Sequence, residues 1–560
     1  MVFNLKLESK ERIRVNSFSF KQRKNIFNEL STASYDVIVV GGGITGSGIT
    51  LDATTRGLKT LLVEMQDFAA GTSSRSTKLV HGGLRYLKQF EIKMVADVGK
   101  ERAIVYENAP HVTHPEWMLL PFYKGGTFGK YSTSFGLRVY DFLAGVKRTE
   151  RRRMLTKEEV LGHEPLLNSE GLVGGGEYVE YRTDDARLTI EVAKKAYEQG
   201  ADLLNYAKVS NFIYDQSGKI KGIEVIDQLT GTKFIANGSV IVNAAGPWVE
   251  QVIEMDEKIT GKSLLLTKGV HLVFDRQKLP LHQPIYFDTP DGRMIFAIPR
   301  NGKTYVGTTD TVFHENLKNP GITLEDKEYI LQSITKMFPD ASIRMSDIES
   351  TWAGVRPLIQ QEGKGPSEIS RKDEVWTSKT GLLTIAGGKL TGYRKMAQSI
   401  TDTICKRLKA QGIESGPCVT KTLRLSGGEF KKSSVYHPYV EDCAKELTKL
   451  GLTFQDGLNI ASMYGTNTNQ VAELVSRVIP SSRLPLAIQL TLLYSIEYEM
   501  AMTPVDYFMR RTGAIFFDIH WVEQWKKDVI SYMKLVFNWS SEQTSQYSDE
   551  LEARLAEAKG

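Results

Sequence analysis

A run of glycines directly after a short apolar segment is the feature that most constrains how this chain can fold. Residues 35–48 read YDVIVVGGGITGSG, and residues 37–40 are four consecutive β-branched residues. Such a run is too short for a membrane span and is typical of a strand buried on both faces. The pattern Gly41-x-Gly43-x-x-Gly46 comes next, then SGITLDATTRG, which predicts a helix, and KTLLVE, which predicts a second strand ending in Glu64. This order of strand, glycine turn, helix, strand and acid predicts a βαβ unit that binds a dinucleotide.

Each residue of this pattern has a physical role in dinucleotide binding. Gly41 permits the tight turn, Gly43 lets the backbone approach a pyrophosphate, and Gly46 lets the helix pack closely on the strand. The helix N-terminus offers unpaired N–H groups and a positive dipole end to the phosphates. Glu64 lies 18 residues after Gly46 and can accept hydrogen bonds from a ribose 2′-hydroxyl, whereas it would repel a 2′-phosphate. The pattern therefore favours FAD or NAD over NADP.

Composition excludes several other classes of protein. The 560 residues predict two to four domains, and 41% hydrophobic with 24% charged residues is typical of a globular, soluble chain. No apolar run approaches the ~20 residues needed to cross a bilayer, and the charged N-terminus has no signal-peptide core. A net charge of +5 is too weak and too scattered to indicate nucleic acid binding. Three cysteines without a CxxC pair predict reduced thiols in a cytoplasmic protein, and nine histidines without HExxH predict no metal site.

Three small-residue segments distinguish FAD from NAD. The first, MQDFAAGTSSRSTKLVHGGLRYL, spans residues 65–87 and suits an extended cofactor that lies along a loop, whereas a plain NAD domain would continue with further βα units. In the second, residues 239–252, a predicted strand ends in Ala244-Ala245-Gly246. In the third, residues 382–404, a predicted strand ends in Gly387-Gly388, and a helix opens near Leu390. We expect the three segments to converge at the C-terminal ends of parallel strands, where open α/β sheets bind ligands.

These segments resemble the FAD-dependent glycerol-3-phosphate dehydrogenase family of the aerobic, quinone-reducing type. The resemblance extends over residues 35–397, roughly two thirds of the chain, and the C-terminal part is similar more loosely. It is carried by the motifs DVIVVGGGITGSGITLDATTRGLKTLLVE, GTSSRSTKLVHGGLRYL, YRTDDARL, NAAGPWV, KGVHLV, GTTDT, AGVRPL and AGGKLTGYRKMA.

The resemblance implies an α/β fold with three parts. A discontinuous, Rossmann-like FAD-binding domain would take residues 1–110, 185–260 and 350–412. An antiparallel-sheet substrate domain, like that of glycine and D-amino-acid oxidases, would take residues 111–184 and 261–349, where GVHLVFD, RMIFAIPR and KTYVGTTD predict strands. Residues 413–560 would form a helical C-terminal domain, in which VEDCAKELTKLG, NTNQVAELVSRVI and LPLAIQLTLLYSIEYEMAM show helical spacing.

The resemblance also implies a set of site residues around a non-covalent FAD. Catalytic roles fall on His271 and Arg356. The residues that bind the phosphorylated substrate are Arg85, Tyr86, Arg371 and Lys389. The residues that bind FAD are Gly41, Gly43, Gly46, Glu64, Thr72, Ser73, Ser74, His81, Gly82, Ala245, Gly246, Gly388, Leu390 and Thr391.

The residues themselves leave alternatives open for these roles. Any one of the cations could be a solvated surface charge, but Arg356 sits in the apolar stretch WAGVRPLI, where an unpaired charge would be costly. Lys389 directly follows a glycine pair at a helix start. His271 lies on an apolar strand, where a histidine is either structural or a base with a pKa near neutrality. His81, on the cofactor segment, is the alternative base.

The implied reaction is oxidation of sn-glycerol 3-phosphate to glycerone phosphate in aerobic glycerol degradation, with hydride transfer to FAD and electrons passed to a membrane quinone. The alternatives are an α-glycerophosphate oxidase that uses dioxygen, an amine or amino-acid oxidase on the same fold, and a non-enzymatic protein with a vestigial nucleotide fold. Oxidase relatives carry an extra insertion for which residues 359–386 leave no room, and the set of cations favours a phosphate. We expect a cytoplasmic protein, peripheral on the inner face of the cell membrane, which a basic stretch at residues 146–155 could contact if it is not merely a solvated loop. A homodimer is compatible with this interpretation.

Overall fold

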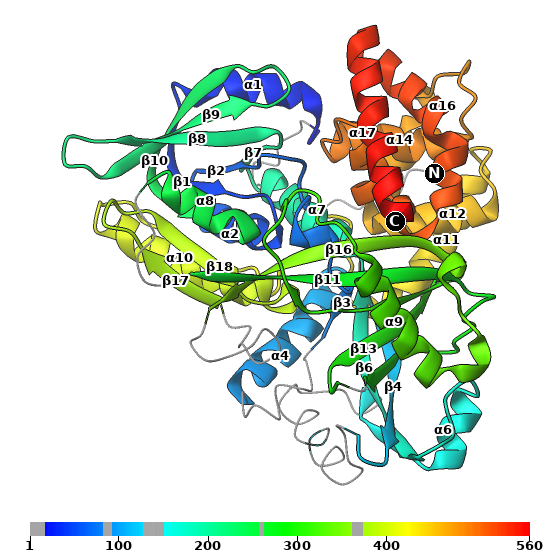
Figure 1. The fold of residues 1–560 in the computed structure, drawn as a ribbon. Coiled ribbons are helices and arrows are strands. Elements are labelled where there is room, and N and C mark those ends of the chain that lie inside the picture. The colour runs from blue at the N-terminus through cyan, green and yellow to red at the C-terminus, as the bar shows by residue number, and fades with distance from the viewer. Residues whose placement is uncertain are drawn as a thin grey trace.

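The chain folds around two β-sheets, and helices of its C-terminal part pack beside both of them (Figure 1). The structure is a computed structural model that describes residues 17–81, 92–126, 136, 138, 150–256, 263–289, 291–360 and 373–560. The strands of sheet A are β1 (Ser34–Val40), β2 (Thr60–Val63), β7 (Asp202–Leu204), β8 (Ala207–Tyr214), β9 (Ile220–Asp227), β10 (Lys233–Asn243), β17 (Asp373–Thr377) and β18 (Leu383–Gly387).

Sheet A has a parallel centre. Its order is β17-β18-β10-β1-β2-β7, in which β18, β10, β1, β2 and β7 run parallel, while β17 and the β8–β9 hairpin pair antiparallel. The buried β-branched residues of β1 lie in its middle, as expected for a strand covered on both faces. The helices around it are α1 (Phe20–Leu30), α2 (Ile44–Thr55), α7 (Asp185–Glu198), α8 (Val249–Glu254) and α10 (Tyr393–Lys409).

Helix α2 is buried on almost every side because small residues let its neighbours approach. It packs against α7 and α10. A Cβ at Gly48 would lie 3.0 Å from the ring of Tyr393 and 3.2 Å from Ala397 Cβ, so this glycine sets the distance between α2 and α10.

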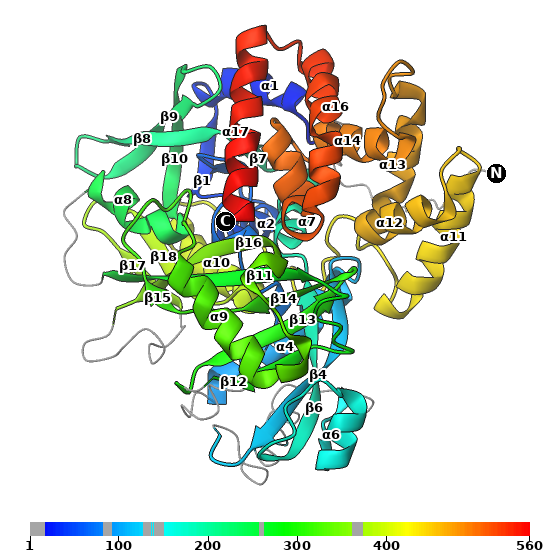
Figure 2. The ribbon, with the colours of Figure 1, turned by 45° about the vertical axis from the view of Figure 1, so that its right-hand side comes forward.

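Sheet B is antiparallel apart from one parallel contact between β4 and β12. Its strands are β3 (Leu79–Val80), β4 (Thr113–Tyr123), β5 (Arg153–Leu155), β6 (Leu172–Thr183), β11 (Leu264–Asp275), β12 (Ile285–Asp288), β13 (Met294–Arg300), β14 (Lys303–Gly307), β15 (Thr311–Val312) and β16 (Ile348–Ile359). One face packs on α6 (Lys157–His163) and α9 (Leu324–Met337) through an apolar cluster, and α4 (Ile92–Asn108) lies near β4. Figure 2 shows α9 in front of this sheet.

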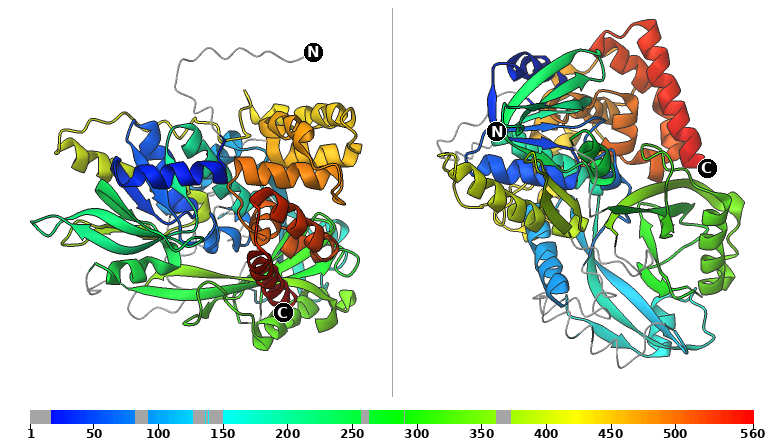
Figure 3. Two further views of the ribbon diagram at one scale, coloured as in Figure 1. Left: turned by 90° about the horizontal axis from the view of Figure 1, so that it is seen from above. Right: turned by 60° about the vertical axis from the view of Figure 1, so that its left-hand side comes forward.

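The C-terminal region is helical and shares an apolar core with the other face of sheet B. Its helices are α11 (Tyr436–Thr448), α12 (Phe454–Tyr464), α13 (Thr468–Glu473), α14 (Leu486–Tyr498), α15 (Ala514–Phe517), α16 (Ile519–Phe537) and α17 (Ser541–Lys559). The view from above shows these helices together at one side of the molecule, beside α1 and sheet A (Figure 3).

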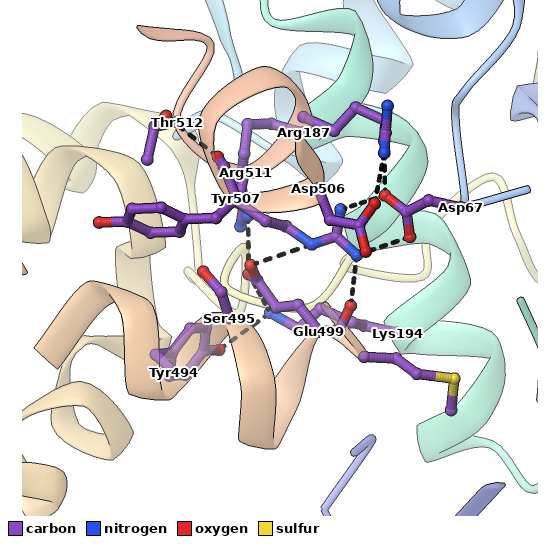
Figure 4. Close-up of polar contacts among 12 residues, drawn as sticks. Asp67, Arg187, Lys194, Tyr494, Ser495, Glu499, Asp506, Tyr507, Arg511 and Thr512 are labelled. Carbon is purple, nitrogen blue, oxygen red and sulfur yellow. Dashed lines mark hydrogen bonds and ion pairs between the residues drawn. The ribbon is translucent and has the colours of Figure 1, made fainter. Parts of the chain in front are cut away.

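A buried cluster of charges ties the C-terminal region to sheet A and α7 (Figure 4). Four acids and four bases take part, none with a side chain more than 6% exposed: Asp67, Glu191, Glu499, Asp506, Arg187, Lys194, Arg510 and Arg511. Arg510 Nε and Arg511 Nη1 lie 2.6 and 2.7 Å from Asp67 Oδ2, and Arg187 Nη1 lies 2.7 Å from Glu499 Oε1. Burial raises the pKa of Asp67, but the two arginines outweigh it and lower that pKa to about 2. The cluster therefore contains equal numbers of acidic and basic residues and joins two parts of the chain that are far apart in sequence.

The expected fold class is confirmed, and two details differ. Strand β16, expected in the FAD-binding domain as part of residues 350–412, instead pairs with β11 of sheet B from Leu264 to Phe274. Helix α2 begins at Ile44, so Gly46 lies inside its first turn rather than before it. The domain limits themselves remain a prediction. Among the described residues, every helix is too short or too polar to span a bilayer.

Candidate active site

A cavity of about 470 Å³ lies where the C-terminal ends of the parallel strands of sheet A meet sheet B. Its walls bring together segments that are far apart in the chain. They include the glycine turn at Gly41 and Gly43, residues 71–73 and 75–77, residues 244–248, residues 385–391, and Thr308 and Arg356 from the side of sheet B. The three small-residue segments thus converge at strand ends, which is the position where open α/β sheets bind ligands.

Backbone geometry explains why only glycine fits the turn after β1. Gly41 has φ 111°, and a Cβ there would lie 2.6 Å from the carbonyl oxygen of Ala244. A Cβ at Gly46 would lie 1.9 Å from the carbonyl oxygen of Gly41. Side chains at either position would push α2 and β10 away from β1, and the floor of the cavity would be lost.

The N-terminus of α2 faces the cavity. Gly43 is its N-cap residue, and both Gly43 and Thr45 line the cavity. The Ile44 N–H donates to Ser73 Oγ at 3.0 Å, so this loop serine satisfies one of the orphan donors of the helix. The helix end is an anion site of the kind that holds a pyrophosphate.

Glu64 has a second role that the sequence pattern did not reveal. It accepts hydrogen bonds from Gly42 N at 2.6 Å and Gln66 N at 2.8 Å, and so fixes the glycine turn from the end of β2. Burial raises the pKa of this carboxyl, and the two N–H donors oppose that effect. Each carboxylate oxygen has a further lone pair, so Glu64 can still accept from ribose hydroxyls.

Asp185 sets the shape of the loop at residues 72–78, a role that sequence reasoning missed. It accepts hydrogen bonds from Ser76 N and Oγ at 2.9 and 2.7 Å and from Lys78 Nζ at 2.6 Å. Lys78 also donates to Ser74 O at 3.0 Å, and Asp185 and Lys78 are both buried. The available signal was the acid pair in YRTDDARL, which follows a strand end. Ser74 is buried in this loop and does not line the cavity.

The loop and the segment after β18 are joined at the cavity. The His81 N–H donates to Thr391 Oγ1 at 3.0 Å, and this hydroxyl donates back to His81 O at 3.3 Å. His81, Lys389, Leu390 and Thr391 all line the cavity. Gly388 has φ 83°, and a Cβ there would lie 2.4 Å from the side chain of Met396, so the turn that presents Lys389 requires glycine.

Arg356 is held in place on the sheet B side of the cavity. Its Nη2 donates to Thr308 Oγ1 at 2.8 Å, and Nη1 lies 3.3 Å from Thr309 O and 3.4 Å from Asp310 Oδ1. The guanidinium lies directly over Gly269, where a Cβ would come within 2.0 Å of Nη2. The side chain is 16% exposed. A fixed, partly buried cation at this wall can stabilise negative charge on a bound oxygen.

His271 does not line the cavity, unlike His81. Its ring is 1% exposed and stacks on Trp352 at 4.6 Å between centroids, and its Nε2 lies 3.0 Å from Thr77 Oγ1. Thr77 stands at the cavity wall. Burial lowers the pKa of His271 well below 6.5, and the charges of Arg356 and Lys78 lower it further, so the ring is neutral at physiological pH.

The remaining predicted residues fall into two groups. Thr72, Ser73, Ala245, Gly246 and Gly388 line the cavity, whereas Gly82, Arg85, Tyr86 and Arg371 lie outside the described residues. Arg75 lines the cavity although no role was predicted for it. Across the described ranges, His, Cys, Asp and Glu nowhere gather in a group of three that could hold a metal ion.

Two family models match the chain. Residues 36–394 match the family described as FAD dependent oxidoreductase, and residues 418–544 match the C-terminal domain of alpha-glycerophosphate oxidase. The aerobic glycerol-3-phosphate dehydrogenases of Bacillus subtilis and Staphylococcus epidermidis are 55% and 54% identical to this chain, over 97% of this chain and 98% of each relative.

Two solved structures with FAD bound are also similar to this chain. The crystal structure of the glycerol-3-phosphate dehydrogenase from Bacillus halodurans complexed with FAD is 45% identical and superimposes with a TM-score of 0.85, covering 97% of this chain and 99% of that chain. The L-alpha-glycerophosphate oxidase from Mycoplasma pneumoniae with FAD bound is 18% identical with a TM-score of 0.54, over 69% of this chain and 97% of that chain, and shares the fold alone.

Proposed function

Because the chain belongs to the aerobic glycerol-3-phosphate dehydrogenase family of FAD-dependent oxidoreductases, we propose that it oxidises sn-glycerol 3-phosphate to glycerone phosphate with FAD. The observation that carries the proposal is the cavity that joins the dinucleotide turn of sheet A to two cations, Arg356 and Lys389. One wall suits a pyrophosphate and a ribose, and the other suits a small anionic substrate.

The residues present fit non-covalent FAD. Gly41, Gly43 and the start of α2 would hold the pyrophosphate, and Glu64 would hold the ribose. A Cβ at Gly246 would meet nothing within 4 Å, so the cavity side of this turn is open to a ligand. FAD supplies the hydride acceptor for the reaction, and the protein supplies position and electrostatics.

The chain's own groups account for the rest of the chemistry. Lys389 binds the substrate phosphate, together with Arg85, Tyr86 and Arg371 from outside the described residues. Arg356 stabilises negative charge on the C2 oxygen as hydride leaves C2. His271 is neutral, and a proton from the C2 oxygen would pass to its Nε2 through the hydroxyl of Thr77, which stands at the cavity wall. Its lowered pKa makes it a weak base, and His81 at the cavity wall is the alternative base.

The final electron acceptor in this proposal is a quinone at the inner face of the cell membrane, which the protein contacts peripherally. The support is the short stretch of sequence between the motifs AGVRPL and AGGKLT, within residues 359–386, which leaves no room for the oxidase insertion. Dioxygen as acceptor is the competing outcome.

The experiment that tests the substrate is anaerobic reduction of the bound flavin, followed by its absorbance. Glycerol 3-phosphate should bleach the flavin, whereas glycerol and glycine should do so poorly at any practical concentration. They lack the phosphate that pairs with the cations of the cavity, and a buried charge left without its partner costs about 3–5 kcal/mol. Equal reduction by glycine would replace this proposal with an amine oxidase. Acid precipitation should release the flavin into the supernatant, and flavin retained in the pellet would contradict non-covalent binding.

Variants separate the roles of the two cations. Arg356→Ala should lower both the reduction rate and the affinity for glycerol 3-phosphate, and Lys389→Ala should act mainly on affinity. Lys395→Ala, on the exposed side of α10, removes a nearby cation outside the cavity and should change neither. A change in rate alone at Lys389 would contradict its assignment to the phosphate.

Reoxidation tests the acceptor. The reduced protein is mixed with ubiquinone-1 under nitrogen or with air-saturated buffer, and peroxide is measured. Fast reoxidation by ubiquinone-1 with little peroxide in air supports the quinone, whereas rapid stoichiometric peroxide formation supports the oxidase.

A further inference from the structure

His271 stands directly opposite Trp352 in sheet B. The two residues pair across β11 and β16, and their rings stack with 4.6 Å between centroids and 11° between planes. Side chains that are paired in this way on neighbouring antiparallel strands share one face of the sheet and interact. Successive residues of a strand point to opposite faces, so a shift of the register by one residue would turn the indole to the other face and end the stack.

The strand on the other side of β11 leaves space for the imidazole. His271 pairs with Gly307 of β14, and a Cβ at Gly307 would lie 2.4 Å from His271 Cδ2. Any side chain at position 307 would therefore push the imidazole out of its place. The ring thus occupies a slot, of which one wall is the indole of Trp352 and the other is the bare backbone of Gly307.

Hydrogen bonds alone do not fix the orientation of this ring. Nε2 of His271 lies 3.0 Å from Thr77 Oγ1, whereas Nδ1 is buried and has no hydrogen-bond partner among the described residues. In histidines that act as bases, the second ring nitrogen is often held by a carboxylate or a backbone carbonyl. A single hydrogen bond leaves the imidazole able to turn about it, so the position of Nε2 depends on the walls of the slot.

Trp352 also holds the loop that contacts the imidazole. Its Nε1 donates to Ser76 O at 3.1 Å, and the hydroxyl of Tyr305 donates to Thr77 O at 3.1 Å. Trp352 and Tyr305 are 3% and 0% exposed, and the ring of Phe516 from the C-terminal region packs on the indole at 5.4 Å between centroids. The same indole therefore fixes both the imidazole and the backbone next to the hydroxyl that stands at the cavity wall.

The indole also offsets the charges around the ring. Burial lowers the pKa of His271, and the charges of Arg356 from β16 and Lys78 from the loop lower it further. Tyr305 from β14 faces the ring as a neutral phenol, because burial raises the pKa of its hydroxyl. The face of an indole attracts a cation, so an imidazolium formed in this slot has one favourable neighbour.

We propose that Trp352 is a positioning residue for the oxidation of the substrate, because it holds Nε2 of His271 against the hydroxyl of Thr77. In the step that it supports, the C2 hydroxyl gives its proton to Thr77 Oγ1 while Thr77 gives its own proton to Nε2, and hydride leaves C2 for the flavin. Trp352 does not line the active-site cavity, so it acts through His271 and not on the substrate. The inference rests on the proposed function, in which His271 takes this proton.

The test uses the FAD-loaded protein and disturbs the slot from both sides. Trp352→Leu removes the indole wall, and Gly307→Ala, which leaves no cavity, intrudes from the opposite strand. Each should lower the limiting rate of anaerobic flavin reduction by glycerol 3-phosphate by about tenfold or more, because general base catalysis contributes roughly 10²–10⁴-fold. The apparent Kd for glycerol 3-phosphate should not change in Trp352→Leu. Trp352→Phe keeps a flat ring and should retain most of the rate.

Two comparisons separate positioning from a general loss of structure. Phe274→Leu, at a fully buried residue of the same strand on the other face of sheet B, is the matched control and should reduce its flavin as the unchanged protein does. In a His271→Asn background, Trp352→Leu should have a much smaller further effect, whereas a general loss of structure would lower the rate by the same factor in both backgrounds.

Crystal structures of the variants give a readout that needs no turnover. The imidazole should turn away from Thr77 in Trp352→Leu, or in Gly307→Ala if Trp352→Leu does not fold, and the 3.0 Å contact should persist in Trp352→Phe. An unchanged contact, equal losses of rate in the two backgrounds, or full activity of His271→Asn would overturn the proposal. If glycerol 3-phosphate fails to reduce the flavin of the unchanged protein, the proposed function fails instead, while the crystal structures still decide whether Trp352 positions the ring.

Discussion

Gly269→Ala is the substitution that most directly tests how Arg356 is held. The new Cβ would lie 2.0 Å from Arg356 Nη2, 2.4 Å from Nη1 and 2.4 Å from Thr308 Oγ1. Atoms in ordinary contact lie about 3.5 Å apart, so the guanidinium must withdraw by about 1.5 Å. That movement breaks the 2.8 Å hydrogen bond to Thr308, and a misplacement of about 1 Å at a reacting centre costs on the order of 10²-fold in rate.

The assay is stopped-flow reduction of the flavin by glycerol 3-phosphate. We expect Gly269→Ala to slow this step by about 10²-fold while FAD is retained, because Gly269 does not line the cavity. Gly162→Ala, at an exposed glycine of α6 with open space around it, is the matched control and should behave as the unchanged protein. In an Arg356→Ala background, Gly269→Ala should have a much smaller further effect than in the unchanged protein, since only its contact with Thr308 Oγ1 remains. Additive losses in the double variant would refute the reasoning.

Three further outcomes follow from contacts described above. Glu64→Ala should weaken FAD retention in equilibrium dialysis, because each charge-assisted hydrogen bond that is lost contributes about 1.5–3 kcal/mol; unchanged retention would exclude Glu64 from the site. Asp185→Asn should lower thermal stability and FAD retention together, because it leaves the buried Lys78 without its acid at a cost of about 3–5 kcal/mol. If neither stability nor FAD retention falls, the loop at residues 72–78 does not depend on the ion pair between Asp185 and Lys78. Burial, with the charges of Arg182, His437 and Arg300, lowers the pKa of His114 to about 3. Below about pH 6.5, His114 therefore binds a proton in the unfolded chain but not in the folded chain. The free energy of unfolding consequently falls on acidification, by about 2 kcal/mol between about pH 7 and 5. Urea unfolding of His114→Gln should show a pH dependence shallower by that amount, and equal dependence in both proteins would contradict it.

Local backbone constraints made the start of the chain predictable. The strand, the glycines, the helix and the acid follow one another directly in the sequence. The close contacts that require glycine at positions 41 and 46 depend on how this glycine turn packs against its neighbours. The helices of the C-terminal region were also predictable, because the spacing of their apolar residues is visible within each short segment. Helices α11, α13 and α14 lie within a few residues of the predicted segments.

Features that depend on distant partners were not predictable in the same way. The apolar pattern of β16 indicates a strand but not which sheet it joins, and its pairing with β11 decides that. His271 is kept from the cavity by Thr77, almost 200 residues away in sequence, and by the ring of Trp352. The role of Asp185 depends on Lys78, more than 100 residues earlier. One sequence shows none of these partners, because folding alone brings them together.

The buried cluster of eight charges limits how this protein can be cut or recombined. A fragment that ends near residue 412 would keep Asp67 and Arg187 but lose the arginines at 510 and 511 and the carboxylate of Glu499, and each buried charge left alone costs about 3–5 kcal/mol. We therefore expect that the first 412 residues do not fold stably on their own. A chimaera between this chain and a relative must take Asp67, α7 and residues 499–511 from the same parent, so the nucleotide-binding part and the C-terminal helices behave as one unit of recombination.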